Sequence, residues 1–492
     1  MLPSNMSSLS KLESFDINEN LFSRPVPSSL FMIPSLIKLN LGRNHFTGPL
    51  EILNFFSSQY NLSKLYIGEN NFSGPIPGSI SKLVGLSELS LSFWNTGGDI
   101  VDFSIFLHLK SLTSLDLSGI HMNISSTLHL PSSMRNLVLS SCKIDEFPKF
   151  LQNHTSLYSL DISANQIKGQ LPEWLWSLPE LGYVNIAHNS FSGELTVLPN
   201  STVDSFIASD NQFSGEIPRA ICEVGTLDLS NNNFSGSIPR CFGVSNTSLS
   251  ILHLRNNSLS GVIPEESLHG YLRSLDVGLN RLSGQLPKSL INCSYLQFLN
   301  LEDNRINDKF PFCGVLPSNY FIGWSVMALV VDVIDNTPGF TLVGGDRDFY
   351  HKSVVFANKG LDMEVVGRGF TIYKTMDVSG NKFEGGIPES IGLLKELIIL
   401  NMSNNAFTGH IPPSLLEGPI PKATQIQSQN ISSFAENPGL CGPPLLKKCG
   451  GVEHDEDDEE KEEKDQVLSW IAAAVGYVPG LFCGLTIAYI FT

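Results

Sequence analysis

The stretch LDLSNNNFSGSIPR, residues 227–240, decides the fold of this chain. Near copies recur as LYIGENNFSGPIP (65–77), LHLRNNSLSGVIP (252–264) and LDVGLNRLSGQLP (275–287). Each copy alternates apolar and polar residues, continues with an asparagine, and ends with glycine and an apolar–proline pair. One copy is too short to bury its own apolar side chains, so the repetition predicts units that bury one another.

The repeat has a period of about 24 residues. From Asn20 to Asn304 the aligned position advances in twelve steps over 284 residues, about 23.7 residues each. This period with an L-x-x-L-x-L pattern is typical of leucine-rich repeats. The fifteen aligned positions hold Asn20, Asn44, Asn70, Trp94, Ile120, Cys142, Asn165, Asn189, Asn211, Asn232, Asn257, Asn280, Asn304, Asn381 and Asn405.

Each unit predicts one short strand and one buried asparagine. The leucines of L-x-L point inward, the residues between them point outward, and neighbouring strands stack into a parallel sheet. The asparagine amide both donates and accepts, so a column of asparagines satisfies backbone groups that water cannot reach. Cys142 stands in this column as a tolerated replacement.

The second half of the unit, FSGxIP, predicts the outer side of the coil. Glycine permits a turn with positive φ, and the Ile-Pro pair halts a helix, so we expect extended or 3₁₀ structure there. The unit resembles the plant-specific type of leucine-rich repeat over about 400 of the 492 residues. This implies a curved right-handed superhelical solenoid with a parallel sheet on its concave face, followed by one C-terminal transmembrane helix.

The rhythm of the repeats divides the chain into six segments. They are about thirteen leucine-rich repeats without an N-terminal cap (1–311), a non-repeat insertion (312–372), two further repeats (373–416), a C-terminal cap (417–451), an acidic juxtamembrane stretch (452–466) and a transmembrane helix (467–492).

The insertion resembles the island domain of plant leucine-rich-repeat receptor-like proteins, which interrupts the solenoid shortly before its last repeats. In that family a tyrosine, eight residues and Lys-Gly form a recurring island motif, and Tyr350, Lys359 and Gly360 match it. The alternative is an ordinary β-hairpin insertion.

The segment SSFAENPGLCGPPLLKKC, residues 432–449, closely resembles the family's C-terminal cap, which implies a disulfide between Cys441 and Cys449. A zinc site is excluded because no second pair of ligands is nearby. Cys222 and Cys241, nineteen residues apart, are either a disulfide between adjacent coils or two buried thiols. Core thiols are expected at Cys142, Cys293 and Cys313, and a lipid-facing or packed thiol at Cys483.

The C-terminal segment combines an acidic run with a charge-free one. Residues 453–465 hold ten acidic residues and two lysines, and residues 467–492 hold no charge. Twenty-six residues make about 39 Å of helix, enough for a hydrocarbon core of about 30 Å. Within that span, small residues at intervals of four form a stripe suited to helix pairing. The stripe consists of Ala472, Gly476, Gly480 and Gly484.

Twelve N-x-S/T acceptor sequences predict a glycosylated, extracellular solenoid. They lie at Asn5, Asn61, Asn71, Asn123, Asn153, Asn200, Asn233, Asn246, Asn256, Asn292, Asn401 and Asn430. Residues 1–15 lack the charged and apolar regions of a signal peptide. Taken literally, this would be a tail-anchored protein with a cytosolic solenoid, but we expect the chain to be incomplete at its N-terminus. Shortened repeat spacings at 309–321 and 411–421 also suggest lost repeat material.

The sequence holds no motif of an enzyme. VVGRGF lacks the strand-to-helix context of a phosphate loop, and the eleven histidines form no HExxH. We expect no catalytic activity, no cofactor, no metal and no nucleic-acid partner.

The resemblance implies a receptor-like protein of the plasma membrane that binds a peptide, protein or glycan. By family frequency we expect a role in plant defence, and the resemblance implies that signalling passes through an adaptor receptor-like kinase and a co-receptor kinase. The alternatives are a leucine-rich-repeat inhibitor that binds without signalling and a non-functional receptor fragment. Candidate ligand contacts, outward-facing on their strands, are Tyr66, Tyr183, His253, Arg255 and Phe298.

Overall fold

The computed structural model separates into two units, Met1–Lys447 and Lys448–Thr492. The description below concerns the first unit, since nearly all of the second lies outside the described residues. The structure describes residues 2–51, 61–124, 129–243, 249–265, 268, 270–307, 321–328, 353–358, 361–366, 374–415 and 431–449.

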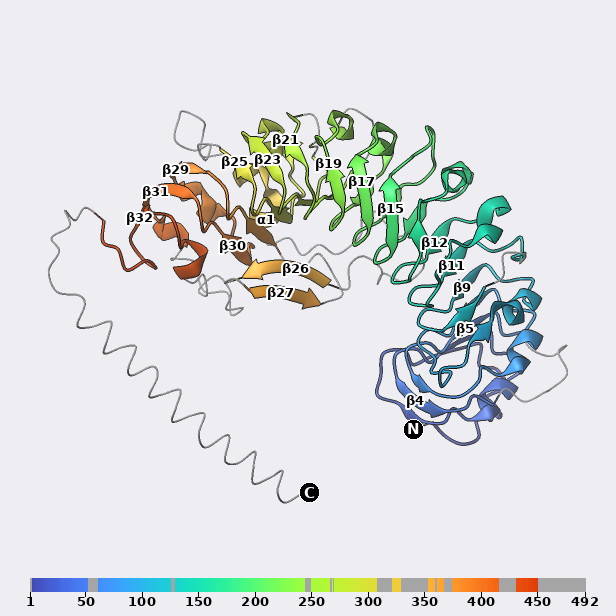
Figure 1. Cartoon of the computed structure of the whole chain (residues 1–492). Coiled ribbons are helices and arrows are strands. Elements are labelled where there is room, and N and C mark those ends of the chain that lie inside the picture. Colours follow the sequence, from blue (N-terminus) through green and yellow to red (C-terminus); the bar gives the residue numbers. More distant parts are fainter. Residues whose placement is uncertain are drawn as a thin grey trace, which may run out of the picture. The chain divides into compact units, whose positions relative to one another are not determined.

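The first unit is a solenoid built on one parallel sheet of fifteen strands, one strand for each aligned repeat (Figure 1). This confirms the predicted leucine-rich-repeat solenoid. Equivalent residues pair across neighbouring coils, as Leu227 does with Leu252. In order, the strands are β1 (Ser14–Asp16), β3 (Lys38–Asn40), β5 (Lys64–Tyr66), β7 (Glu88–Ser90), β9 (Ser114–Asp116), β11 (Asn136–Val138), β12 (Ser159–Asp161), β14 (Tyr183–Asn185), β16 (Ser205–Ile207), β18 (Thr226–Asp228), β20 (Ile251–His253), β22 (Ser274–Asp276), β24 (Phe298–Asn300), β28 (Thr375–Asp377) and β30 (Ile399–Asn401).

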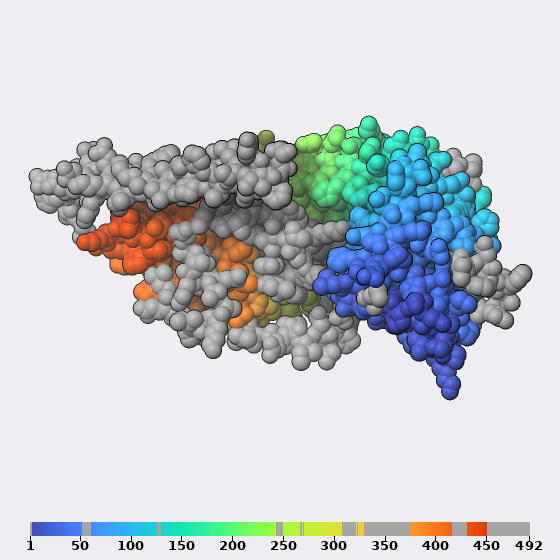
Figure 2. Space-filling model, turned by 90° about the horizontal axis from the view of Figure 1, so that it is seen from below, coloured from blue at the N-terminus to red at the C-terminus, as the bar shows by residue number. Residues whose placement is uncertain are grey.

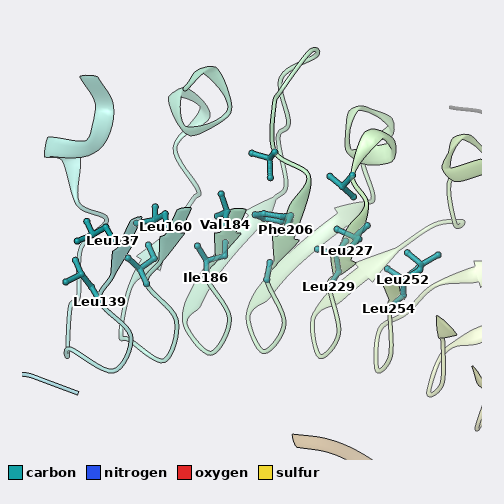
Figure 3. Packing of buried hydrophobic residues seen from close by; sticks show 14 of the residues in the cluster. Leu137, Leu139, Leu160, Val184, Ile186, Phe206, Leu227, Leu229, Leu252 and Leu254 are labelled. Atoms are coloured by element: carbon teal, nitrogen blue, oxygen red, sulfur yellow. The ribbon is translucent and has the colours of Figure 1, made fainter. Parts of the chain in front are cut away.

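The core runs through the centre of the coils. In each coil the middle residue of the strand and the residue just after the strand point inward, as Leu227 and Leu229 do in Figure 3. Both are fully buried, and so are Val184 and Ile186 two coils earlier. Because each coil buries the apolar side chains of its neighbours, the core is continuous along the solenoid.

The asparagine column works as predicted. The Asn232 amide nitrogen donates to the carbonyls of Ala208, Leu229 and Ser230 at 3.0–3.1 Å. Its Oδ1 accepts from the Phe213 amide of the preceding coil at 3.0 Å. These four bonds hold the turn in which Asn231 takes a left-handed conformation, with φ of 54°.

Cys142, like Trp94 and Ile120, replaces the asparagine of the column, and Asn437 adds a further position to it. Cys142 is fully buried, and its sulfur donates to the Leu117 carbonyl at 3.2 Å, replacing part of an asparagine's bonding. Asn437, which sequence alignment missed, makes the full set of column bonds to Met402, Phe434 and Ala435. It lies in the cap, where no L-x-L strand precedes it to mark its place.

Short 3₁₀ helices form the outer side of the coils, as predicted. The proline of the Ile-Pro pair does not end them; it lies directly before their first residue, as Pro218 does with φ of −69°. Proline's fixed φ suits this position. They include η1 (Ser28–Met32), η3 (Gly78–Lys82), η4 (Phe103–His108), η5 (Lys149–Asn153), η6 (Glu173–Ser177), η7 (Arg219–Glu223), η8 (Arg240–Gly243), η10 (Lys288–Asn292), η12 (Glu389–Leu393) and η13 (Pro413–Leu415).

Smaller parallel sheets lie between the main sheet and the 3₁₀ helices. At their centre, buried phenylalanines stack along the solenoid, with Phe213 about midway between Phe191 and Phe234 at centroid distances of 6.0 and 6.1 Å. The strands are β2 (Ser23–Arg24), β4 (His45–Gly48), β6 (Asn71–Phe72), β8 (Val101–Asp102), β10 (Met122–Asn123), β13 (Lys168–Gly169), β15 (Ser190–Glu194), β17 (Gln212–Glu216), β19 (Asn233–Ser235), β21 (Ser260–Gly261), β23 (Arg281–Gly284), β25 (Arg305–Ile306), β29 (Glu384–Gly386), β31 (Ala406–His410) and β32 (Gly439–Cys441).

Part of the predicted insertion, 312–372, packs with the solenoid. In η11 (Phe321–Gly323) and α1 (Ser325–Ala328), the side chains of Phe321, Trp324 and Met327 are at most 1% exposed and belong to the core. Trp324 Nε1 donates to the Leu290 carbonyl of the preceding coil at 2.9 Å. The three residues recur at every third position and carry no leucine, so the repeat pattern could not reveal them.

The same insertion contains a β-hairpin. β26 (Ser353–Asn358) pairs antiparallel with β27 (Leu361–Val366), and Asn358 faces Leu361 across the connection. The motif residues Tyr350, Lys359 and Gly360 lie outside the described residues.

The cap continues the stacking of the coils. η15 (Ile431–Ser433) precedes Phe434, which is 1% exposed in the core. β32 then extends the last small sheet by pairing with β31. Within the part of the chain that the structure describes, no helix is both long and apolar enough to cross a bilayer. The predicted span 467–492 and its stripe, Ala472, Gly476, Gly480 and Gly484, lie outside that part.

Candidate functional site

The concave face consists of the outward side chains of the fifteen-stranded sheet. The strands of this sheet follow the inner side of the curved solenoid in Figure 1. Three positions of each coil contribute to the concave face: the first and third strand residues, and the second residue after the strand. In β22 these are Ser274, Asp276 and Gly278. Figure 2 views the molecule from below, where described residues of the N-terminal coils are visible.

The third strand position carries a row of Asp and Asn residues that sequence reasoning did not single out. Asp228 Oδ1 accepts from the Ser230 amide at 3.0 Å, and Asp161 Oδ1 accepts from the Ser163 amide at 2.9 Å. The carboxylate thus stabilises the turn at the end of the strand, because Asp and Asn side chains often accept a hydrogen bond from the backbone two residues later. The recurring LDL and LNL triplets were the available signal.

The central part of this row is a buried acidic cluster. In register across five strands stand Asp228, His253, Asp276, Asn300 and Asp377, each at most 5% exposed. Burial raises the pKa of Asp276 to about 7 and that of Asp377 to about 6. Removing a carboxylate from water disfavours its charged form, which explains both shifts.

Arg255 links three coils beside this row. Its Nη1 donates to Glu302 Oε2, two coils away, at 2.7 Å, and the two side chains are 11% and 6% exposed. The guanidinium passes over Gly278, where an added Cβ would lie 2.8 Å from Nη1. A side chain at this position would therefore displace the guanidinium from its present position.

A second feature lies on the coils of β14 and β16. Tyr183, Ala187 and Ile207 form an apolar cluster separate from the core, at 5–7% exposure. The Tyr183 hydroxyl has no hydrogen-bond partner among the described residues, and burial raises its pKa. This position was predicted from its aromatic, outward-facing side chain.

The N-terminal coils present the accessible part of the face. Lys64 Nζ lies 2.6 Å from Glu88 Oε1, and the Tyr66 hydroxyl donates to the same carboxylate. Lys38 pairs with Asp16 at 2.7 Å. All but Asp16 are half-buried, and Asp16 is exposed. Charged pairs of this kind contribute little to stability, so the charges remain available for contacts with another molecule.

The five predicted ligand contacts therefore fall into two environments. Tyr66 is half-buried, whereas Tyr183, His253, Arg255 and Phe298 are at most 9% exposed. The His253 ring lies 2.6 Å from the Ser274 hydroxyl, which ties it to the next coil. Sequence identified the outward direction of these side chains but not their burial.

Four cysteines lie among the described residues of the repeats. Cys222 and Cys241 form a disulfide with Cα atoms 5.7 Å apart, which settles the alternative left open by their spacing. Cys142 and Cys293 are buried free thiols, and burial raises the pKa of each to about 12. Cys313 and Cys483 lie outside the described residues.

Cys441 and Cys449 are both disulfide-bonded. Their mutual pairing stays a prediction.

The described glycosylation acceptors are nearly all exposed. Asn401 is the exception: it is half-buried at the end of β30, and its Nδ2 donates to Asp377 and Ser379 at 2.9 and 3.1 Å. Asn246 and Asn430 lie outside the described residues. The exposed acceptors are Asn5, Asn61, Asn71, Asn123, Asn153, Asn200, Asn233, Asn256 and Asn292.

Comparison with known sequences agrees with this architecture. The sequence model described as Leucine Rich Repeat matches 61–83, 156–178, 225–244, 248–268, 374–394 and 396–417. Receptor-like protein 50 of Arabidopsis thaliana is 66% identical, with 81% of this chain and 54% of the relative aligned. Receptor-like protein 48 of the same plant is 58% identical, with 100% of this chain and 74% of the relative aligned. The chain thus spans about half to three quarters of these relatives.

Solved structures share the fold. The plant peptide hormone receptor RGFR1, in complex with RGF2, has a TM-score of 0.55 at 23% identity, over 84% of this chain and 62% of the receptor. The ectodomain of the Arabidopsis thaliana membrane receptor kinase GASSHO1/SCHENGEN3, in complex with CASPARIAN STRIP INTEGRITY FACTOR 2, has a TM-score of 0.50 at 25% identity, over 84% and 53%.

Proposed function

Because the chain belongs to the family of plant receptor-like proteins with leucine-rich repeats, we propose that it is a cell-surface receptor. It binds an extracellular peptide, protein or glycan on the concave face. It signals in plant defence through an adaptor receptor-like kinase and a co-receptor kinase. The concave face carries this proposal, because fifteen strands present side chains of varied chemistry on one regular scaffold.

The first contact area is the half-buried group on β3, β5 and β7. Lys38, Lys64, Tyr66 and Glu88 offer both charges and one aromatic ring within three neighbouring strands. Such a surface suits a ligand with charged and apolar groups in alternation, as in an extended peptide. The ectodomain of GASSHO1/SCHENGEN3 was solved in complex with CASPARIAN STRIP INTEGRITY FACTOR 2, which supports ligand binding by a solenoid of this type.

We infer that signalling passes through a partner kinase in the membrane. Helix pairing through Gly476 and Gly480 would bring an adaptor kinase alongside, since small residues let two membrane helices approach closely. Replacing both glycines with leucine keeps the segment apolar and removes the close approach. The tagged full chain is expressed in leaves, and receptor kinases that co-purify are identified by mass spectrometry. Equal recovery of a kinase with both forms would refute the pairing.

Ligand binding is tested on the same leaves with microbial culture filtrate as the probe. An oxidative burst that depends on the chain, and that a Lys64→Glu/Tyr66→Ala variant loses, supports the proposal. Lys149→Glu on the outer helix η5 is the control, because it changes a comparable charge away from the concave face. A burst that both variants reduce equally, or that does not need the chain, contradicts it. A chain on which no acceptor carries N-glycan contradicts the extracellular placement.

A further inference from the structure

We propose that an N-glycan on Asn292 packs against a platform formed by Tyr271 and Tyr295. The proposal rests on the extracellular placement proposed above. It adds a defined carbohydrate contact on the flank of the solenoid, away from the concave face.

The two tyrosines form an exposed aromatic stack. Their rings lie 6.4 Å apart between centroids with an interplanar angle of 12°. Tyr271 is 62% and Tyr295 is 47% exposed, and among the described residues Phe93 is the other exposed aromatic side chain. Each tyrosine stands three residues before its strand, in register across β22 and β24. Two large rings held together in water leave apolar surface unburied, which indicates a contact that covers them.

The backbone at Asn292 lies close to that of both tyrosines. It is exposed at the end of η10 and precedes Tyr295 by three residues. Its carbonyl oxygen also lies 3.3 Å from the point where a Cβ of Gly270 would stand, and Gly270 directly precedes Tyr271. The acceptor therefore stands three residues before one tyrosine on its own coil, and its backbone lies beside the residue that precedes the other tyrosine on the preceding coil.

The chemistry of a sugar fits this platform. One face of a pyranose carries C–H groups with slight positive charge, and the face of an aromatic ring is negative. The sugar attached to Asn292 is tethered beside the rings, so its local concentration exceeds that of any free saccharide. For this reason we assign the chain's own glycan, and not a free saccharide, to the surface of the two tyrosine rings.

The chain contains a matched control. Asn153 ends η5 as Asn292 ends η10, and each acceptor lies six residues before its strand, β12 or β24. The positions that correspond to Tyr271 and Tyr295 hold Ser133 and Ser156. Asn153 is therefore an exposed acceptor in the same setting without the rings.

The experiment measures how fast an N-glycan-removing amidase acts on the folded full chain from plant membranes. Site-resolved mass spectrometry follows release at Asn292 and Asn153 in the wild type and in Tyr271→Ser/Tyr295→Ser. An aromatic contact of ordinary strength slows release at Asn292 about two- to tenfold relative to Asn153. The double substitution brings the Asn292 rate to that of Asn153 and leaves Asn153 unchanged.

Several results overturn the proposal. Equal release at both sites in the wild type does so, as does a slow Asn292 rate that survives the double substitution. An unoccupied Asn292 beside an occupied Asn153 overturns the glycan contact but leaves the extracellular placement intact. Absence of glycan at every acceptor overturns both. Binding of soluble N-acetylglucosamine oligomers to Asn292→Gln, lost with the tyrosines, would assign the platform to an external saccharide instead.

Discussion

Replacing Asn232 by alanine tests how the asparagine column stabilises the solenoid. Four hydrogen bonds disappear, but three of the acceptors keep another donor: Asn211 donates to the Ala208 carbonyl, Asn257 to that of Leu229, and the Asp210 amide to that of Ser230. The Phe213 amide alone loses its described partner. The cost is therefore that of one buried unsatisfied N–H group, about 1–3 kcal/mol, and not four times this value.

Hydrogen exchange of the Phe213 amide measures this cost locally. Solenoids need not unfold in one step, so a global denaturation curve would mix several coils. A loss of about 1–3 kcal/mol accelerates exchange roughly 5- to 150-fold. The effect is largest at Phe213 and decreases in coils farther away, because each coil contacts only its neighbours.

Asn20→Ala is the control for this experiment. Asn20 is exposed, and its amide donates to the carbonyls of Ile17 and Asn18 within its own turn. Its loss leaves groups that water can satisfy, so exchange nearby changes little. If Asn232→Ala and Asn20→Ala have equal effects, or if exchange of the Phe213 amide is unchanged, burial is not what makes the hydrogen bonds of the column stabilising.

Three further predictions concern the concave face. Arg255→Met leaves Glu302 buried and unpaired, which lowers the free energy of unfolding by about 3–5 kcal/mol. Adding Glu302→Gln to Arg255→Met restores most of this loss. If urea denaturation shows instead that the losses from the two substitutions add, the result argues against the pair. The folded pKa of Asp276, about 7, exceeds the ordinary 3.8, so wild-type stability falls as pH rises from about 4 to 7. Asp276→Asn should therefore raise the melting temperature at pH 8 and leave it nearly unchanged at pH 4; a gain independent of pH would be the contrary result. Asn401 should carry far less glycan than Asn153 because its amide is hydrogen-bonded, and equal occupancy by mass spectrometry would disprove this.

Local sequence was sufficient for the repeating parts of the fold. The column asparagine, the glycine of FSG and the Ile-Pro pair each act within one coil or between adjacent coils. Their geometry follows from a repeat of about 24 residues, so the strand, the turn and the 3₁₀ helix of each coil could be predicted. Prediction failed where the pattern lapsed, as at Trp324 in the predicted insertion and Asn437 in the cap.

Tertiary structure decided the environment of individual side chains. The 47-residue separation of Arg255 and Glu302 closes only when three coils stack, and Gly278 leaves room for it. The repeat alone likewise could not tell whether Cys222 meets Cys241. Sequence thus determined which way each side chain points, because the periodicity sets direction. Burial, pairing and pKa depend on what the neighbouring coils place opposite each side chain, and only the assembled solenoid determines that.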